Sequence, residues 1–383
     1  MALKKLALIR SGYSPFGGIE MHALSLMNKL LDYNVQIDLL TRPHQNWPIN
    51  HPKLNIVALG VNKGNRLFQS WIFNRSVRQY LKEQSFHCVF SMDQVDTCTH
   101  IHAGGGSHKV FLKIKNQSSP VMARLFRKFS LFHNYILKLE KKAFTGEMLQ
   151  KIRCCSEMVR QDISNHYQVP ENKMIVVHNG IDWSGIGSFF ESRLSLKEDL
   201  QKKHALNPNW KMLLFLGSGF MRKGLDIAIK GLKHMDDDFH LLVIGKGAPK
   251  PFMQIAKKIG VENRVHILGP QEKGWKYAAL CKGFVLPSRY EPFGRAAAEA
   301  QAMGIPALVS NRTGYAELIQ PKKNGIVMNF PESDNEIHNS FKNFAHLMNN
   351  PVLSSEDIRN HIEHLDDEAV IKTLIRDFLS LHP

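Results

Sequence analysis

The sequence predicts an α/β protein built from two doubly wound, parallel-sheet domains. Short, continuously apolar runs such as Leu6–Ile9 alternate with longer segments of helical periodicity such as Ile19–Leu31, and this alternation is typical of parallel sheets that helices cover on both faces. The pattern starts again at Lys211–Leu216, which runs into a glycine-rich turn. A second sheet is therefore expected in the carboxyl-terminal half of the chain.

The turn-rich segment His178–Asp182 marks the expected boundary between the two domains. We place a first domain at residues 1–180 and a second at residues 181–360. A carboxyl-terminal helix at residues 361–383 is expected to pack back on the first domain.

Each expected strand is a short apolar run, and each expected helix is a longer amphipathic segment. In the first domain the strands are Leu6–Ile9, Val35–Leu40, Asn55–Leu59, His87–Ser91, a strand ending in the glycine loop Gly104–Gly106, Ile152–Ser156 and Met174–Val177, and the helices are Ile19–Leu31, Leu67–Lys82 and Glu157–Tyr167. In the second domain the strands are Lys211–Leu216, His240–Ile244, Arg264–Leu268, Gly283–Leu286 and Ala307–Ser310, which completes the sheet, and the helices are Arg193–His204, Leu225–Leu232, one that starts near Pro292, and one or two within Glu356–Leu381.

Composition limits the class of protein and its partners. The chain has 383 residues with 43% hydrophobic and 22% charged side chains, as in an ordinary soluble globular protein. Its net charge of +16 is unusual and favours anionic partners, which are nucleic acid, phosphorylated substrates or an acidic membrane surface. Composition alone leaves all three open.

Cysteine usage and hydropathy indicate the compartment. The five cysteines are scattered and odd in number, which is typical of free thiols in a reducing compartment. The amino-terminal run has too short an apolar core for a secretory signal, and no apolar run approaches the roughly 18 residues of a membrane span. We therefore expect a cytoplasmic protein whose membrane contact is peripheral, on the inner face of the cytoplasmic membrane.

Two carboxylates, Glu291 and Glu299, stand eight residues apart across the start of an expected helix. Pro292 suits the first helical turn, so Glu291 would lie at the helix mouth and Glu299 about two turns inside the helix. Gly294 removes a side chain where the first free N–H groups point outward, an arrangement that binds phosphate. This outline fits a sugar nucleotide, although a glutamate in a first turn is also a common partner of the helix dipole.

Two glycine turns follow apolar strands and could receive an anion. The loop containing Gly17 and Gly18 lacks the G-x-G-x-x-G spacing of a dinucleotide fingerprint. The turn from Gly217 to Gly224 carries Arg222 and Lys223 to a helix amino terminus, where cations and free N–H groups would converge on one anion. The alternative is an exposed basic pair in a chain that is basic throughout.

Three histidines, His100, His102 and His108, lie within nine residues around the glycine loop. No carboxylate or cysteine with ligand spacing accompanies them, so we expect no metal site. The pattern favours a strand and glycine loop that carry one histidine into a cleft.

The segment Lys109–Lys142 interleaves nine lysines and arginines with aromatic and aliphatic residues and has a single acid, Glu140. One interpretation is a helix pair whose apolar face joins the core. The other is a basic, aromatic surface that contacts anionic lipid headgroups. Both interpretations stay open at this stage.

Several of these segments resemble one family, in the same order and over nearly the whole chain. The loop at Gly17 and Gly18, His178–Asp182, Gly217–Gly224, Pro287-Ser288 and the E-x7-E pair resemble the retaining glycosyltransferases of family 4. The resemblance implies the GT-B architecture, in which two Rossmann-like domains face a cleft, the first binding the acceptor and the second the nucleotide sugar. Pro15–Gly18 and Gly217–Gly224 are especially similar to the subgroup that adds the first outer-core glucose to the inner-core heptose of lipopolysaccharide.

The resemblance also implies roles for single residues. It assigns Arg222 and Lys223 to the donor diphosphate, and Glu291 and Glu299 to the donor sugar and the ribose. The other donor-binding positions that it implies are Phe293, Gly294, Arg295 and Ala296 at the helix mouth, and Gly17 and Gly18 across the cleft. Many family members place a histidine at the end of a first-domain strand against the donor sugar. His102 is the candidate here, whereas the lipopolysaccharide subgroup has an acidic residue near this position.

The implied reaction is metal-independent transfer of a hexose with retention, from a UDP-sugar such as UDP-glucose to a glycan or glycolipid acceptor. His102, Arg222, Lys223 and Glu291 are the candidate catalytic residues. A glycogen- or starch-type synthase or phosphorylase would share the fold and the phosphate chemistry. A hydrolase-type carboxylate pair and a non-enzymatic nucleic-acid-binding protein are further alternatives, but no RNP-type motif is present and no nucleic-acid partner is expected.

Overall fold

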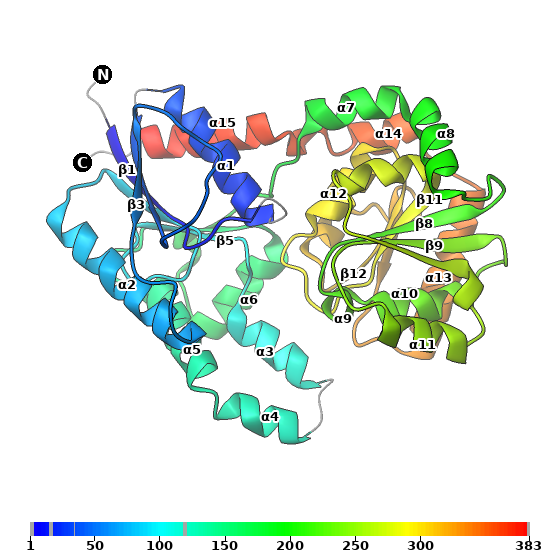
Figure 1. The fold of residues 1–383 in the computed structure, drawn as a ribbon, viewed down its shortest axis with the longest axis horizontal. Coiled ribbons are helices and arrows are strands. Elements are labelled where there is room, and N and C mark those ends of the chain that lie inside the picture. Colours follow the sequence, from blue (N-terminus) through cyan, green and yellow to red (C-terminus); the bar gives the residue numbers. More distant parts are fainter. Residues whose placement is uncertain (1–3, 15–17, 34, 118–120, 381–383) are drawn as a thin grey trace. The chain divides into compact units, whose positions relative to one another are not determined.

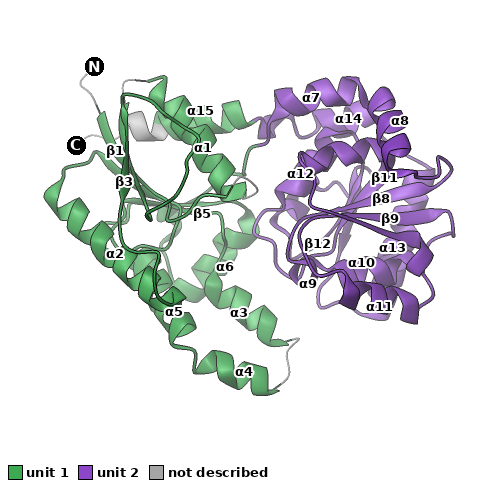
Figure 2. Cartoon of the chain, viewed as in Figure 1, with its two compact units in different colours: residues 1–180, 367–383 green, residues 181–366 purple. Residues whose placement is uncertain are grey.

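The computed structural model describes residues 4–14, 18–33, 35–117 and 121–380, with side chains to Arg376. The chain forms two compact units, which are Met1–Gly180 with Asp367–Pro383 and Ile181–Asp366. Figure 1 shows the succession of helices and strands, and Figure 2 shows unit 1 in green and unit 2 in purple. Each unit is a parallel sheet covered by helices, so the predicted fold class of two doubly wound α/β domains is confirmed.

The sheet of unit 1 has seven strands among the described residues, and all of its strand pairs are parallel. Its spatial order is β3-β2-β1-β4-β5-β6-β7. The strands are β1 (Lys4–Ile9), β2 (Val35–Thr41), β3 (Leu54–Ala58), β4 (Cys88–Ser91), β5 (His100–Ala103), β6 (Lys151–Cys154) and β7 (Met174–Val176).

The helices of unit 1 include three within the basic segment, where the sequence suggested a pair. They are α1 (Gly18–Leu31), α2 (Arg66–Glu83), α3 (His108–Gln117), α4 (Val121–Lys128), α5 (Leu131–Thr145), α6 (Glu157–Tyr167) and α15 (Asp367–Ser380). Glu140, the one acid of that segment, is fully buried and accepts hydrogen bonds from the Ser107 hydroxyl (2.8 Å) and the His108 backbone N–H (2.6 Å). It therefore caps the amino terminus of α3.

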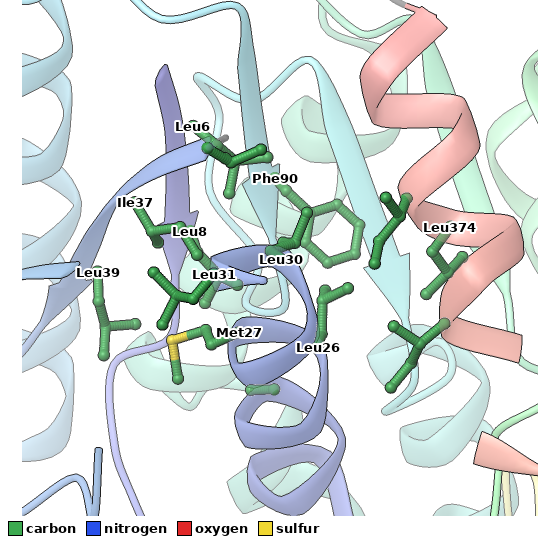
Figure 3. Close-up of a cluster of buried hydrophobic side chains, with 14 of the residues drawn as sticks. Leu6, Leu8, Leu26, Met27, Leu30, Leu31, Ile37, Leu39, Phe90 and Leu374 are labelled. Carbon is green, nitrogen blue, oxygen red and sulfur yellow. The ribbon is translucent and has the colours of Figure 1, made fainter. Parts of the chain in front are cut away.

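One hydrophobic cluster joins the sheet of unit 1 to α1 and α15 (Figure 3). Buried side chains of β1, β2 and β4 meet those of α1, and α15 adds Ile371, Leu374 and Ile375. Lys29 of α1 lies 3.1 Å from Glu368, and Ser25 donates a hydrogen bond to Asp367. The carboxyl-terminal helix is thus part of the core of unit 1.

The sheet of unit 2 is also parallel throughout, with the order β10-β9-β8-β11-β12-β13. Its strands are β8 (Lys211–Leu216), β9 (Phe239–Ile244), β10 (Val265–Gly269), β11 (Cys281–Leu286), β12 (Ala307–Ser310) and β13 (Gly325–Met328). The expectation that Ala307–Ser310 completes this sheet was wrong, because β13 pairs with β12 over four residues.

The helices of unit 2 cover its sheet and precede its carboxyl-terminal boundary. They are α7 (Trp183–Glu191), α8 (Arg193–His204), α9 (Phe220–Lys223), α10 (Leu225–Leu232), α11 (Lys250–Lys258), α12 (Arg295–Ala302), α13 (Asp334–Asn349) and α14 (Ser355–Asn360). Within the described ranges, no helix of either unit is both long enough and apolar enough to cross a membrane.

In each sheet the direction in which strands are added reverses once. In unit 1, β2 and β3 lie on one side of β1, and β4 to β7 lie on the other. In unit 2, β9 and β10 lie on one side of β8, and β11 to β13 lie on the other. Ligands of such sheets bind outside the carboxyl ends of the strands at the reversal point. The ends of β1 and β4, and of β8 and β11, are therefore the places to examine.

Candidate functional site

Three charged side chains meet at the reversal point of unit 2. Arg222 and Lys223 follow β8 on the short helix α9, and Glu291 follows β11. Arg222 Nη1 lies 2.7 Å and Lys223 Nζ lies 3.3 Å from the same oxygen, Oε2 of Glu291. The structure thus brings together three residues that the sequence identified separately.

Backbone packing fixes this cluster, because the turn after α9 lies against the loop that follows β11. Gly224, between α9 and α10, has φ of +77°, and a Cβ there would collide with the carbonyl oxygen of Pro287. The Arg289 backbone N–H donates to the Arg222 carbonyl (2.9 Å), and Arg222 Nη1 donates to the Tyr290 carbonyl (2.8 Å). A glycine is required at position 224 because only it combines the left-handed conformation with so close an approach.

The electrostatics of the cluster keep Glu291 ionised. Burial by itself would raise the pKa of Glu291, but Lys223 and Arg222 outweigh burial and hold the pKa below its ordinary value. The side chain is 15% exposed, and that of Lys223 is 12% exposed. The two cations therefore face a fixed anion in a partly desolvated position, where a charged ligand would feel them strongly.

Helix α12 starts later than the sequence suggested. Gly294 precedes it with φ of +99°, and the helix begins at Arg295, so Pro292 is not in its first turn. Backbone hydrogen bonds keep residues 291–293 in the preceding loop, since Gly314 N–H donates to the Glu291 carbonyl (2.9 Å) and Tyr315 N–H to the Phe293 carbonyl (2.6 Å). The amides of Arg295 and Ala296 stand in the first turn of the helix, where backbone N–H groups lack an intrahelical acceptor.

The side chain of Phe293 belongs to the core of the loop. It is 2% exposed and packs edge-on against Tyr315, with ring centroids 5.8 Å apart. Phe293 was expected among the donor-binding residues. Its side chain anchors the loop that carries Glu291, and its role in donor binding stays a prediction.

Glu299 is the fifth residue of α12, about one turn into the helix rather than two. Its Oε1 lies 3.0 Å from Nε of Arg295, and its side chain is 16% exposed. Burial raises the pKa of Glu299, and Arg295 and then Lys223 offset part of this effect. The two glutamates of the E-x7-E pair thus have different partners and opposite pKa shifts.

A second ion-pair cluster supports the first, and sequence reasoning missed it. Arg289 makes a two-pronged pair with the buried Asp226, at 2.8 and 2.7 Å, and lies 3.1 Å from Glu332. Its Nη1 also donates to the Met221 carbonyl of α9 (2.7 Å). The available signal was Asp226 itself, a carboxylate within the otherwise apolar first turn of Leu225–Leu232.

His102 is the penultimate residue of β5 in unit 1 and lines a pocket of about 160 Å³. It is 5% exposed, and its ring centroid lies 5.1 Å from that of His22. Burial, then His22 and Arg153, lower its pKa well below the ordinary value, and its Nε2 has no hydrogen-bond partner among the described residues. A neutral imidazole with an unused nitrogen can therefore bind a ligand hydroxyl.

Arg10 and Asp93 meet at the reversal point of unit 1. Arg10 follows β1, Asp93 follows β4, and the two side chains form an ion pair. Arg10 also lies 2.7 Å from Glu20 of α1, and both Arg10 and Asp93 line the His102 pocket. Sequence reasoning missed this network, because isolated charges after two strands give no signal until the strand order is known.

The remaining glycines and histidines that the sequence singled out do not share one set of contacts. Gly17 lies outside the described residues, and Gly18 is the first residue of α1. His100 Nδ1 contacts the Cys88 thiol (3.4 Å), and His108 Nε2 contacts His133 Nδ1 (3.1 Å). In the described parts of the chain, no group of three or more His, Cys, Asp or Glu side chains could hold a metal ion.

Two family models match the chain, one in each half. Residues 16–184 match the family described as Glycosyltransferase Family 4, and residues 197–360 match the family described as Glycosyl transferases group 1. The lipopolysaccharide glucosyltransferase WaaG of Escherichia coli is 23% identical over 336 residues, which cover 85% of each chain. An uncharacterised glycosyltransferase of Methanocaldococcus jannaschii, MJ1607, is 29% identical over 193 residues, which cover 48% of this chain and 47% of the relative.

Solved structures share the whole fold. The crystal structure of WaaG superposes with a TM-score of 0.80 at 19% identity and covers 98% of this chain and all of WaaG. The structure of HepE from Anabaena in complex with UDP and glucose has a TM-score of 0.68 at 16% identity and covers 99% of this chain and all of HepE. These similarities, the two family matches and the paired reversal points agree, and the chain belongs to the GT-B glycosyltransferases, with a family 4 domain followed by a group 1 domain.

Proposed function

We propose that the protein transfers a hexose from a UDP-sugar, with UDP-glucose as the first candidate, to a glycan or glycolipid acceptor such as the heptose of a lipopolysaccharide core. The observation that carries this proposal is the convergence of Arg222 and Lys223 on Glu291 at the reversal point of unit 2. Two cations suit a diphosphate, and a carboxylate beside them suits sugar hydroxyls. The identity of the nucleotide is supported by HepE, which was crystallised with UDP and glucose.

The charges suggest how the departing diphosphate would be stabilised. When the bond between the sugar C1 and the diphosphate oxygen breaks, negative charge grows on that oxygen. Arg222, Lys223 and the first-turn amides of α12 are groups that can take up this charge, a role that a divalent cation fills in other transferases. We therefore propose that donor binding and transfer need no added metal.

Retention requires the new bond to form on the face from which the diphosphate leaves. In the proposed step the acceptor hydroxyl attacks C1 on that face, and its proton passes to the departing phosphate oxygen. Glu291 holds hydroxyls of the donor sugar, Glu299 binds the ribose, and His102 supplies a neutral hydrogen-bonding nitrogen to the sugar. The ion pairs at 2.7 and 3.0 Å already engage Glu291 and Glu299, which disfavours the pair as nucleophile and acid of a hydrolase.

Titration calorimetry tests the proposal directly. UDP, UDP-glucose, UDP-galactose and ADP-glucose would be titrated into the full chain with and without a chelator. We expect the UDP compounds to bind in both conditions and the adenine compound to bind more weakly. Transfer to an acceptor would then be followed by NMR of the anomeric proton, which reports retention. Loss of UDP binding in chelator, or an inverted product, would refute the corresponding part of the proposal.

The exposed side of the basic segment is proposed as the membrane-contacting surface. Every residue of α4 is described and none is buried. Apolar side chains of α4 and the residue after it are strongly exposed, among them Phe126 (74%) and Phe129 (74%), and Arg124, Arg127 and Lys128 accompany them. This combination suits shallow insertion into anionic lipid. A glycolipid acceptor would explain why a glycosyltransferase carries such a surface.

A further inference from the structure

Unit 1 contains a second and larger pocket that neither the predicted donor residues nor His102 line. Its volume is about 400 Å³. It lies between α2, α5 and the ends of β1, β2 and β4, and the lining residues that matter below are Arg42, Arg66, Gln69, Asn74, Asp93 and Phe132. Two of its lining residues, Asp93 and Gln94, also line the His102 pocket. The two pockets are therefore neighbours along the sheet edge where ligands of such folds bind.

A buried amide points to a hydroxyl-bearing ligand. Asn74 of α2 is 7% exposed, and its Nδ2 donates to the Ser70 carbonyl (3.0 Å). Its Oδ1 is buried and has no hydrogen-bond donor in the described part of the chain. A buried carbonyl oxygen without a donor is costly, and a hydroxyl of a ligand in this pocket would satisfy it.

One wall of the pocket suits the apolar face of a sugar ring. Phe132 of α5 lines it, and the Arg66 guanidinium lies 5.1 Å from the Phe132 ring centroid. Phe73 and Leu139 are 3% and 6% exposed and form part of the same lining. An aromatic wall beside polar groups is the usual composition of a pocket that orients a small ligand.

The charge of the pocket favours an anion. Arg42 is held in place because its Nη1 donates to Gln69 Oε1 (2.9 Å) and its Nε to the Ser11 carbonyl (3.1 Å). Arg66 is exposed at the pocket. The carboxylate among the lining residues, Asp93, is paired with Arg10. Two arginines thus face a pocket whose acid is already neutralised.

We propose that this pocket binds a sugar unit of the acceptor that carries an anionic group, either a phosphate or a carboxylate. Arg42 and Arg66 contact the anion, Asn74 Oδ1 accepts from a ring hydroxyl, and Phe132 packs against the ring. Because Asp93 and Gln94 line both pockets, the bound sugar unit lies beside the pocket of His102. The inference rests on the proposed transferase function and specifies its acceptor as an acidic glycan.

The test uses the full chain and four probes, which are glucose, glucose 6-phosphate, glucuronic acid and inorganic phosphate. Affinities would be measured by ligand-observed NMR. We expect at least one of the two acidic sugars to bind about tenfold more tightly than glucose, because a charge-assisted hydrogen bond is stronger than a neutral one. The stronger of the two acidic sugars distinguishes a phosphate from a carboxylate. Inorganic phosphate is expected to bind more weakly than the preferred acidic sugar.

Two variants separate the charge from the hydroxyl contact. Arg66→Gln should reduce the preference for the acidic sugar over glucose, and because Arg66 is exposed the fold should be retained. Asn74→Leu should weaken glucose and the acidic sugar by the same factor. Arg75→Gln is the matched control, because Arg75 is the exposed residue next to Asn74 on α2 and lies over Trp71 rather than in the pocket.

UDP affinity, measured on the same samples, separates this inference from the proposed function. A wild-type chain that binds UDP but binds glucose as well as both acidic sugars would overturn the acidic acceptor alone. The same holds if Arg66→Gln and Arg75→Gln behave alike, or if inorganic phosphate binds as well as the preferred sugar. A chain that binds acidic sugars but no nucleotide would instead overturn the proposed transferase function.

Discussion

Arg289 and Asp226 form a two-pronged ion pair, with nitrogen–oxygen distances of 2.8 and 2.7 Å, directly behind the cluster of Arg222, Lys223 and Glu291. Asp226 is 8% exposed. Arg289 also donates through its Nη1 to the Met221 carbonyl and through its backbone N–H to the Arg222 carbonyl. It therefore ties the short helix that carries Arg222 and Lys223 to the loop that carries Glu291.

Removing this arginine should destabilise the fold and loosen the donor site. Arg289→Met leaves Asp226 buried without its partner, and we expect a loss of about 3–5 kcal/mol in the free energy of unfolding. The double variant Arg289→Met, Asp226→Leu removes the buried charge as well and should lose less than the sum of the two single variants. Urea unfolding followed by circular dichroism measures these differences. Strictly additive losses would show that the pair is not coupled.

Donor binding should depend on Lys223 and transfer on Glu291. Lys223→Ala removes a charge-assisted contact and should weaken UDP binding by about ten- to a hundredfold. Glu291→Gln should abolish transfer while circular dichroism shows that the fold is retained. Calorimetry with UDP and a transfer assay provide the measurements. Lys230→Ala, an exposed lysine of α10, is the control, and near-normal activity of both site variants would place the donor elsewhere.

The free energy of unfolding should decrease in acid, because buried histidines such as His240 resist protonation in the folded state. Burial, then His266 and Arg264, lower the pKa of His240 to about 4 in the folded protein. Its pKa in the unfolded chain is about 6.5. Between these values the unfolded state holds a proton that the folded state lacks, so stability decreases as the pH falls from 6.5 to about 4, by at most about 1.4 kcal/mol per pH unit.

His240→Phe should flatten this dependence. The ring of His240 stacks on Trp210, with centroids 4.1 Å apart, and phenylalanine keeps the stacking while removing the titration. Urea midpoints measured at several pH values between 4 and 7.5 would be compared for the wild type, His240→Phe and the exposed-site control His346→Phe. An identical slope in all three chains would contradict the assignment.

Binding to anionic vesicles should depend on the charges of α4. Replacing Arg124, Arg127 and Lys128 with Gln should weaken sedimentation with anionic vesicles, because each basic residue near such a surface contributes about 1 kcal/mol. UDP affinity should be unchanged. The matched control replaces Lys250, Lys257 and Lys258 of α11, which are exposed, and it removes the same charge. Equal sedimentation of the two triple variants would mean that net charge, and not the surface of α4, causes binding.

Local signals predicted most elements of the fold. Leu225–Leu232 was predicted with the bounds of α10, and Lys211–Leu216 with those of β8, since a glycine marks one boundary of each: Gly224 precedes the helix and Gly217 follows the strand. The start of α12 was misplaced because proline suits a first turn, and the left-handed Gly294 that delays the helix is decided by packing against Thr313 and Tyr315. Strand β13 was not among the predicted strands.

The site was predicted only in part, for a similar reason. Arg222, Lys223 and Glu291 were found because glycine turns and a spaced carboxylate pair mark them in the sequence. Arg289 with Asp226, and Arg10 with Asp93, join residues 63 and 83 positions apart. Apart from Asp226, which stands in an otherwise apolar turn, nothing local distinguishes these residues from other charges. The same is true of the pocket around Asn74, which exists only because α2, α5 and three strand ends converge.

The return of α15 to the core of unit 1 makes unit 2 a nested domain, inserted into a host that resumes after it. The insertion points are neighbours, because a Cβ added at Gly180 would overlap Asp367. A stop codon after residue 366 would remove Ile371, Leu374 and Ile375 from the host core, so truncation cannot release unit 1 intact. Direct fusion of residue 180 to residue 367 keeps α15 and leaves out unit 2, so this fusion is the design expected to yield unit 1 by itself.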